Sequence, residues 1–399
     1  MRLMHRNLAL VSALILTSSL RAETDVYLTG VPDYTWFAGA SATACGNLAG
    51  YWDRHGLDNI YTGSLSSGIA PLSSSGANSD IRFLWASTNH LRDYWASYNL
   101  ATGISSYEST ALDRYVLSNW VDHVPDCIAD FIGASQRRWV GLNGECDGNI
   151  DGYAFVYWDA TGERRTNFVP PASAGSPARD LQSGLREWMK WRGYDADVFT
   201  QLADFNPNSP PGKGFSFADL KREIDSGFPV LLWLQPTNEF SRALGMGSVN
   251  AMPHANPRTS AMLAYGYYVG DDNSQWMHVR TSFGSSGGLN DIVVPWTGDN
   301  MLSTGLPARG AIGFHPKPRI ATLKRELNTL TFTIEGGTPQ LYDNIAGTMR
   351  VVNRQYIIER TSSLEVPFAP ITIPLTNWVI SVQETFTGNA FFRVQELVP

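Results

Sequence analysis

Apolar residues recur at helical spacing in several separate stretches of the chain. Between Gly39 and Gly56 they form one stripe, with small residues crowded at the start and a glycine where a helix would end. The same spacing predicts a helix over 180–192, and Ser216 stands where its hydroxyl can cap another. Further helical patterns cover 81–98 and 111–121. The sequence therefore predicts several amphipathic helices before residue 230.

Strand patterns separate these helices and fill the C-terminal part of the chain. Pro229–Leu234 is short and continuously apolar, which is typical of a buried strand, and Thr259–Tyr267 is a second candidate. From about Phe314 the helical patterns disappear, and short alternating strands such as 330–334 follow one another between turn signals. We therefore expect residues 314–399 to form a small β-sandwich of the immunoglobulin or fibronectin type.

Residues 1–22 have the features of a secretory signal peptide. A positive head containing Arg2 and Arg6 precedes the apolar run 8–16, and small residues lead to Ala22, after which we predict cleavage. The run is too short to span a bilayer, and no later segment is long and apolar enough. We therefore expect a secreted or periplasmic protein with no transmembrane segment in the mature chain.

The composition indicates packed globular domains, since 43% of the residues are hydrophobic and 12% are aromatic. A net charge of −7 without a basic cluster argues against a nucleic-acid partner. The three cysteines, Cys45, Cys127 and Cys146, allow one disulfide with one thiol left over. Cys45 is expected to be a buried core thiol within the first helix.

The first helical stretch carries a recognisable motif. The turn at 39–44 and the helix ending Gly-Tyr-Trp-Asp at 50–53 resemble the nucleophile segment of secreted bacterial papain-like cysteine peptidases, relatives of the bacteriocin-processing type. In that family a Gly-Cys turn opens the central helix, and the helix dipole and a partner His activate the thiol. The segments 126–133 and 259–267 are similar to the family as well.

The resemblance covers about residues 27–313 and implies an α+β, papain-like domain over 23–313. Its helical half would pack on an antiparallel sheet half, with a cleft between them. The C-terminal β-sandwich at 314–399 would follow as a second domain.

The resemblance also identifies three catalytic positions, and all three have lost their chemistry. Ala40 occupies the nucleophile position, and a methyl group cannot attack a carbonyl. Ser260 stands where the family has the base His, and Thr281 stands where it has the Asp or Asn that orients the His. Three losses in one site indicate a scaffold that no longer needs the reaction.

Other residues offer partial replacements for this machinery. Tyr34 takes the place of the oxyanion donor, which in the family precedes the nucleophile by about six residues. Ser41 adjoins the nucleophile position but leaves the helix about 100° away. Cys45 lies beyond a full helical turn, and His254 lies six residues before Ser260. A hydrolase with relocated catalytic residues is therefore one alternative.

Residues 147–152 match the first half of a calcium-binding loop, with ligand types at Asp147, Asn149 and Asp151. Trp158 occupies the twelfth position, where a bidentate Glu is needed, and a simple β-turn explains the same residues. Calcium therefore stays an alternative to the turn, and we expect no other cofactor.

The function expected from these features is that of a secreted, catalytically inactive homologue of papain-like peptidases. Its cleft would bind an extended peptide or a protein, such as a cell-surface component, without hydrolysis. A second alternative is a structural secreted protein in which Tyr34, Trp36 and Phe37 fill the groove.

Overall fold

The structure is a computed structural model, which describes residues 23–63, 68–94, 123–134, 162–169, 180–234, 260–281, 290–298, 308–376, 379–383 and 390–397. The predicted signal peptide lies outside these residues. The helices are α1 (Ala40–Arg54), the 3₁₀ helix η1 (Gly76–Leu84), α2 (Thr88–Tyr94), α3 (Ile128–Ile132), α4 (Leu181–Trp191) and α5 (Phe217–Asp225).

The strands of a large first sheet are β1 (Thr24–Leu28), β2 (Arg165–Thr166), β3 (Ala196–Leu202), β4 (Val230–Leu234), β5 (Ser260–Val269), β6 (Gln275–Arg280), β7 (Asp291–Pro295), β8 (Ala308–Pro316), β11 (Gln340–Asp343) and β12 (Thr348–Val351). The strands of two smaller sheets are β9 (Arg319–Glu326), β10 (Thr329–Glu335), β13 (Gln355–Thr361), β14 (Ala369–Pro370), β15 (Val379–Gln383) and β16 (Phe391–Leu397). The fold is mixed α+β with antiparallel sheets, as the sequence predicts at this coarser level.

The first sheet is organised around β5, its longest strand. Its order is β12-β11-β1-β5-β4-β8-β3-β2, and β6 and β7 continue from β5 off this path. Ala264 pairs with both β4 and β6, and Tyr267 pairs with both β1 and β6. Hence β6 occupies one edge of β5, while β4 and β1 share the other edge in succession.

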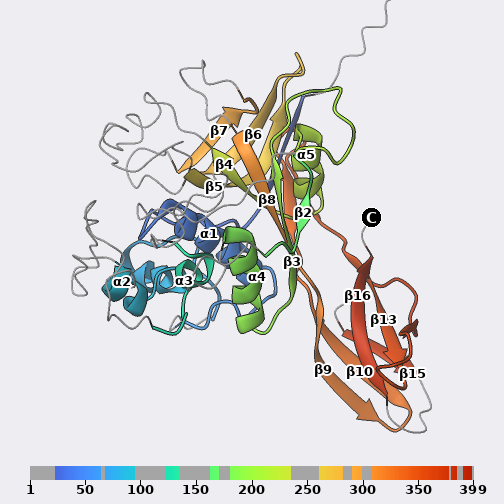
Figure 1. Cartoon of the computed structure of the whole chain (residues 1–399). Helices are drawn as coiled ribbons and strands as arrows, with labels where there is room; N and C mark the ends of the chain where they lie inside the picture. The colour runs from blue at the N-terminus through green and yellow to red at the C-terminus, as the bar shows by residue number, and fades with distance from the viewer. Residues whose placement is uncertain are drawn as a thin grey trace, which may run out of the picture.

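Helix α1 packs along β5 and is buried from Ala40 to Asp53. Small residues allow this close packing: a Cβ added at Gly46 would lie 2.5 Å from the Trp85 ring. The helix ends at Arg54, and Gly56 has a φ of 102°, a conformation that favours glycine. Figure 1 shows α1 to α4 gathered on one side of the sheet.

Two predicted helix starts are confirmed in detail. Asp180 caps α4 by accepting a hydrogen bond from the Ser183 N–H at 2.6 Å. Ser216 caps α5 by accepting a hydrogen bond from the Asp219 N–H, and the Asp219 carboxylate accepts one from the Ser216 N–H. Each cap satisfies backbone donors that the first turn leaves without a helical partner.

The stretch 81–98, predicted as one helical pattern, is interrupted in the structure. The 3₁₀ helix η1 ends at Leu84, and α2 begins at Thr88 with the Ser87 hydroxyl oxygen accepting from the His90 N–H. Between them, Trp85 donates its indole N–H to the Phe37 carbonyl oxygen at 3.0 Å. This long-range contact, which the local pattern does not contain, accompanies the break. Residues 95–98 and 111–121 lie outside the described residues.

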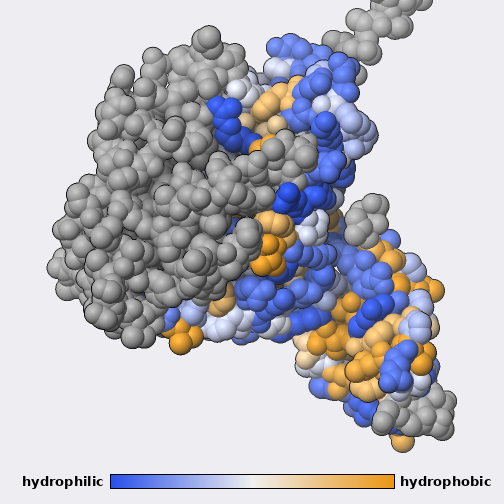
Figure 2. Space-filling model, viewed as in Figure 1, coloured by the Kyte–Doolittle hydropathy of each residue, from blue (hydrophilic) through white to orange (hydrophobic). Residues whose placement is uncertain are grey.

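The C-terminal part of the chain forms the two smaller sheets, in the orders β15-β10-β9 and β14-β13-β16. They share a hydrophobic core of their own, to which Phe332 and Phe392 contribute with ring centroids 5.2 Å apart. The predicted strand at 330–334 is therefore present as β10. Figure 2 shows apolar residues on the surface of this part, where Leu327, Leu364 and Ile373 are exposed.

The hairpin β11–β12 departs from the predicted boundary at residue 314. It belongs to the first sheet, because β11 pairs with β1 through contacts such as Leu341 with Leu28. The chain thus leaves the first sheet after β8, forms β9 and β10, and returns before β13. Backbone pairing between such distant segments has no local sequence signal.

In the part of the chain that the structure describes, no helix is long and apolar enough to cross a membrane.

Candidate functional site

The predicted nucleophile position lies at the first residue of α1. Ala40 is 1% exposed and follows Gly39, whose φ of 123° turns the chain into the helix. The Thr43 hydroxyl holds this turn. It donates a hydrogen bond to the Gly39 carbonyl oxygen at 2.8 Å and accepts one from the Phe37 N–H at 3.0 Å. The helix therefore begins where the sequence predicted, but a methyl group stands at its first position.

The other two predicted positions lie at the start of β5 and directly after its neighbour β6. β5 begins at Ser260, and β6 ends at Arg280, which pairs with Leu263. Thr281 is the residue directly after β6. Thr281 is buried, and its N–H donates to the Asn290 carbonyl oxygen at 2.9 Å.

Tyr34, the predicted oxyanion donor, is placed elsewhere on the helix. Its hydroxyl donates to the Pro71 carbonyl oxygen at 2.8 Å, and its ring stacks on Trp85. A Cβ added at Gly50 would lie 2.5 Å from this hydroxyl. Gly50 follows Ala40 by ten residues, or about 15 Å of helix. The structure therefore does not bring the Tyr34 hydroxyl to the start of α1.

The substitute nucleophiles are buried. Ser41 and Cys45 are both fully buried within α1, and Cys45 is a free thiol. Burial raises the pKa of the Cys45 thiol far above its usual range, so a thiolate is strongly disfavoured. Cys45 thus behaves as the predicted core thiol. His254 lies outside the described residues.

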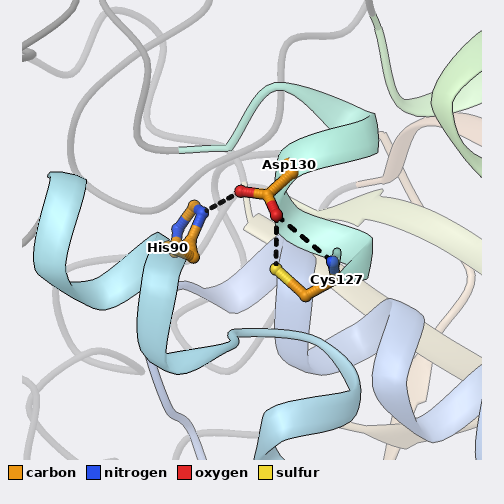
Figure 3. Close-up of side chains that lie close together, drawn as sticks. All are labelled: His90, Cys127 and Asp130. Atoms are coloured by element: carbon orange, nitrogen blue, oxygen red, sulfur yellow. Dashed lines mark hydrogen bonds and ion pairs between the residues drawn. The ribbon is translucent and has the colours of Figure 1, made fainter. Parts of the chain in front are cut away.

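A second group of reactive side chains gathers between α2 and α3, where sequence reasoning had identified only a family-like segment. Figure 3 shows His90 and Cys127 pointing toward the carboxylate of Asp130. His90 Nδ1 lies 2.7 Å from one carboxylate oxygen, and the Cys127 thiol donates to the other at 3.1 Å. His123 Nε2 also contacts the second oxygen, at 3.0 Å. We call these four residues the Asp130 cluster.

The ionisation of the Asp130 cluster follows from its contacts. Burial by itself would raise the pKa of Asp130, but hydrogen bonds from His123 and His90 outweigh it and hold that pKa well below its usual range. Burial and the neighbouring Asp130 charge raise the pKa of Cys127 well above its usual range. In the absence of a cation beside them, Cys127 is therefore a neutral thiol and Asp130 an ionised carboxylate.

His90 is the residue that sequence reasoning missed, because it stands 40 positions before Asp130 with no motif around it. Cys127 is one of the three cysteines considered for a disulfide and part of the segment 126–133, and neither pattern predicts its contact with Asp130. The calcium candidates Asp147, Asn149 and Asp151 lie outside the described residues, as does Cys146.

A cavity of about 870 Å³ lined by several charged residues lies between α5, β8 and β16. His315 and Glu223 meet on its wall at 2.5 Å, and Arg164 and Arg393 also line it. Acidic and basic groups are mixed around this cavity, so its charge selects neither anions nor cations.

Comparisons with known proteins add no assignment to this geometry. No protein-family model matches the chain, and searches of curated proteins and of solved structures also gave no match.

Proposed function

We propose that this chain is a secreted or periplasmic papain-like protein that has lost catalysis and binds an extended peptide or protein segment. The observation that carries the proposal is the placement of the three motif positions. Ala40 opens a helix that packs along β5, and β5 itself begins at Ser260. Thr281 directly follows β6, the strand that pairs with β5.

The side chains present argue against hydrolysis at these positions. Ala40 has no nucleophilic atom, and Thr281 has no carboxylate or amide to orient a base. The one cysteine of α1 is buried with a raised pKa. Removing a nucleophile alone lowers kcat by about a millionfold in a serine protease, so we expect no measurable cleavage.

A second candidate is a structural protein whose groove is filled from within. The burial of Ala40, Tyr34 and Phe37 favours it, since these residues are at most 4% exposed. In that case the region around the start of α1 would be part of the hydrophobic core and would take no ligand. The two candidates differ in whether position 40 is accessible.

The decisive experiment restores the missing groups. The triple variant Ala40→Cys/Ser260→His/Thr281→Asp should cleave peptides of a diverse library, and thiol-blocking reagents should stop this cleavage. The wild type should cleave none of them. The double variant Ser260→His/Thr281→Asp is the matched control, because it has the base but no nucleophile. Peptides cleaved by the triple variant should bind the wild type saturably.

Accessibility is measured separately with the single variant Ala40→Cys. A thiol at this position of an open groove should react with iodoacetamide much faster than Cys45. Alkylation as slow as that of Cys45, together with no peptide binding, would favour the structural protein. Cleavage by the wild type, or a folded triple variant without activity, would overturn the proposal.

A further inference from the structure

One oxygen of Asp130 receives contacts from four groups. His123 Nε2, the Cys127 thiol and the backbone N–H groups of Asp126 and Cys127 all lie within 3.0–3.2 Å of Oδ2. A carboxylate oxygen offers about two lone-pair directions. The oxygen is therefore crowded with donors, one of which, the Cys127 N–H, makes the capping-box bond at the start of α3.

The residue types at this point are those that bind transition metals. His90, Cys127 and Asp130 each offer one ligand atom, and these atoms all lie within 4.8 Å of one another. All three residues are at most 2% exposed. Imidazole nitrogen, thiolate sulfur and carboxylate oxygen together are a typical zinc set, whereas calcium and magnesium take oxygen ligands.

We propose that His90, Cys127 and Asp130 bind one zinc ion, and that His123 positions the Asp130 carboxylate. Zinc bonds of about 2.0–2.3 Å place tetrahedral ligands roughly 3.3–3.7 Å apart. His90 contacts one carboxylate oxygen of Asp130 at 2.7 Å and Cys127 contacts the other at 3.1 Å, so zinc binding would lengthen these contacts and turn one oxygen toward the ion. The zinc charge would also deprotonate the Cys127 thiol.

The site would join two parts of the helical region. His90 lies in α2, and the other two ligands lie at the start of α3, 37 and 40 residues later. Helix α3 in turn packs tightly on α4, because a Cβ added at Gly184 would lie 2.3 Å from the Phe131 carbonyl oxygen. Where the unfolded chain has no formed site, the free energy of zinc binding adds to the free energy of folding. Loss of the ion should therefore loosen α2 and α3 first.

The test begins with the purified wild-type protein, prepared without chelators. Elemental analysis should find about one zinc per chain, and dipicolinate should remove it with a fall in Tm. Cobalt chloride added to the stripped protein should give visible d–d bands and a sulfur-to-cobalt charge-transfer band. Zinc chloride should displace the cobalt and restore Tm.

Variants then assign the ligands. Cys127→Ala should abolish the charge-transfer band and lower zinc affinity by more than a hundredfold. Cys45→Ala is the matched control, since it removes the other buried thiol, and it should keep the full zinc content. His123→Gln should weaken zinc binding by roughly 10–100-fold while the charge-transfer band stays, as expected for a positioning residue.

Two results would overturn the proposal. A folded wild type with far less than one zinc per chain, and no cobalt spectrum after addition of the metal, would leave the cluster as a hydrogen-bond network. Zinc binding that survives Cys127→Ala but is lost in Cys45→Ala would place the ion elsewhere. The wild-type measurements decide the first point even where a variant fails to fold.

Discussion

The hydroxyl of Tyr51 donates a hydrogen bond to the carbonyl oxygen of Gly227 at 2.9 Å, across 176 positions of sequence. Both residues are buried. Tyr51 lies in the last turns of α1, and Gly227 precedes β4, so this bond ties the central helix to the first sheet. It helps fix the direction in which α1, and therefore Ala40, runs along β5.

The variant Tyr51→Phe should lower the free energy of unfolding by about 1–3 kcal/mol, because the Gly227 carbonyl oxygen is left buried without its donor. Chemical denaturation of both proteins measures this difference. Tyr268→Phe is the control: its hydroxyl bonds Glu23 at the surface, and a change within about 0.5 kcal/mol is expected. Equal effects of the two variants would contradict the assigned role.

Arg354 connects the first sheet with the C-terminal sheets. It is buried, and its guanidinium holds both carboxylate oxygens of Glu396 and donates to the Pro316 carbonyl oxygen at 2.9 Å. Lysine cannot reproduce this fork of donors. Arg354→Lys should therefore destabilise the protein by roughly 3 kcal/mol, which thermal unfolding can detect.

Arg350→Lys provides the comparison for this change. Arg350 is exposed, and its ion pair with Asp225 at 3.2 Å lies at the surface. Surface pairs contribute about 0–1 kcal/mol, so Tm should hardly move. If Arg354→Lys were equally harmless, the contacts of Arg354 with β8 and β16 would not stabilise the junction.

Asp53 should make stability depend on pH in a defined window. Burial raises the pKa of Asp53 to about 6, although the Ala70 and Tyr61 N–H groups, each 2.7 Å from it, oppose the shift. Between about pH 4 and 6 the folded state then binds more protons than the unfolded state, so this carboxyl makes stability fall as pH rises.

The variant Asp53→Asn should remove this contribution and flatten the pH dependence of the unfolding free energy in that window. Each pKa unit corresponds to about 1.4 kcal/mol. Denaturant titrations at several pH values measure the slope for both proteins. An unchanged slope in the variant would show that Asp53 keeps its ordinary pKa in the folded state.

Leu327 offers a stabilising change. It sits in the tight turn between β9 and β10 with a φ of 53° and is 92% exposed, so a bulky side chain is held in a left-handed conformation without packing. Leu327→Asn should raise the unfolding free energy by up to about 1 kcal/mol. Leu364→Asn, also at an exposed leucine but without positive φ, should leave stability unchanged.

Short-range sequence signals, namely helix caps, apolar periodicity and a terminating glycine, correctly predicted several helices and one strand. The caps at Asp180 and Ser216 and the apolar stripes behind them correctly predicted α4 and α5. The glycine at position 56 correctly predicted the end of α1, and the apolar run after Pro229 became β4. These predictions succeeded because capping and hydrophobic periodicity act within a few residues.

What the sequence by itself determined is thus helices such as α1, α4 and α5, strands such as β4, and the residue types at Ala40, Ser260 and Thr281. Only the tertiary structure decided that β11 pairs with β1, that Tyr34 lies far from Ala40, and that His90 meets Asp130. The contacts behind them, of β1 with β11, Tyr34 with Pro71 and His90 with Asp130, join segments tens to hundreds of residues apart. Such pairings depend on how the elements pack together, and no short-range pattern in the chain records them.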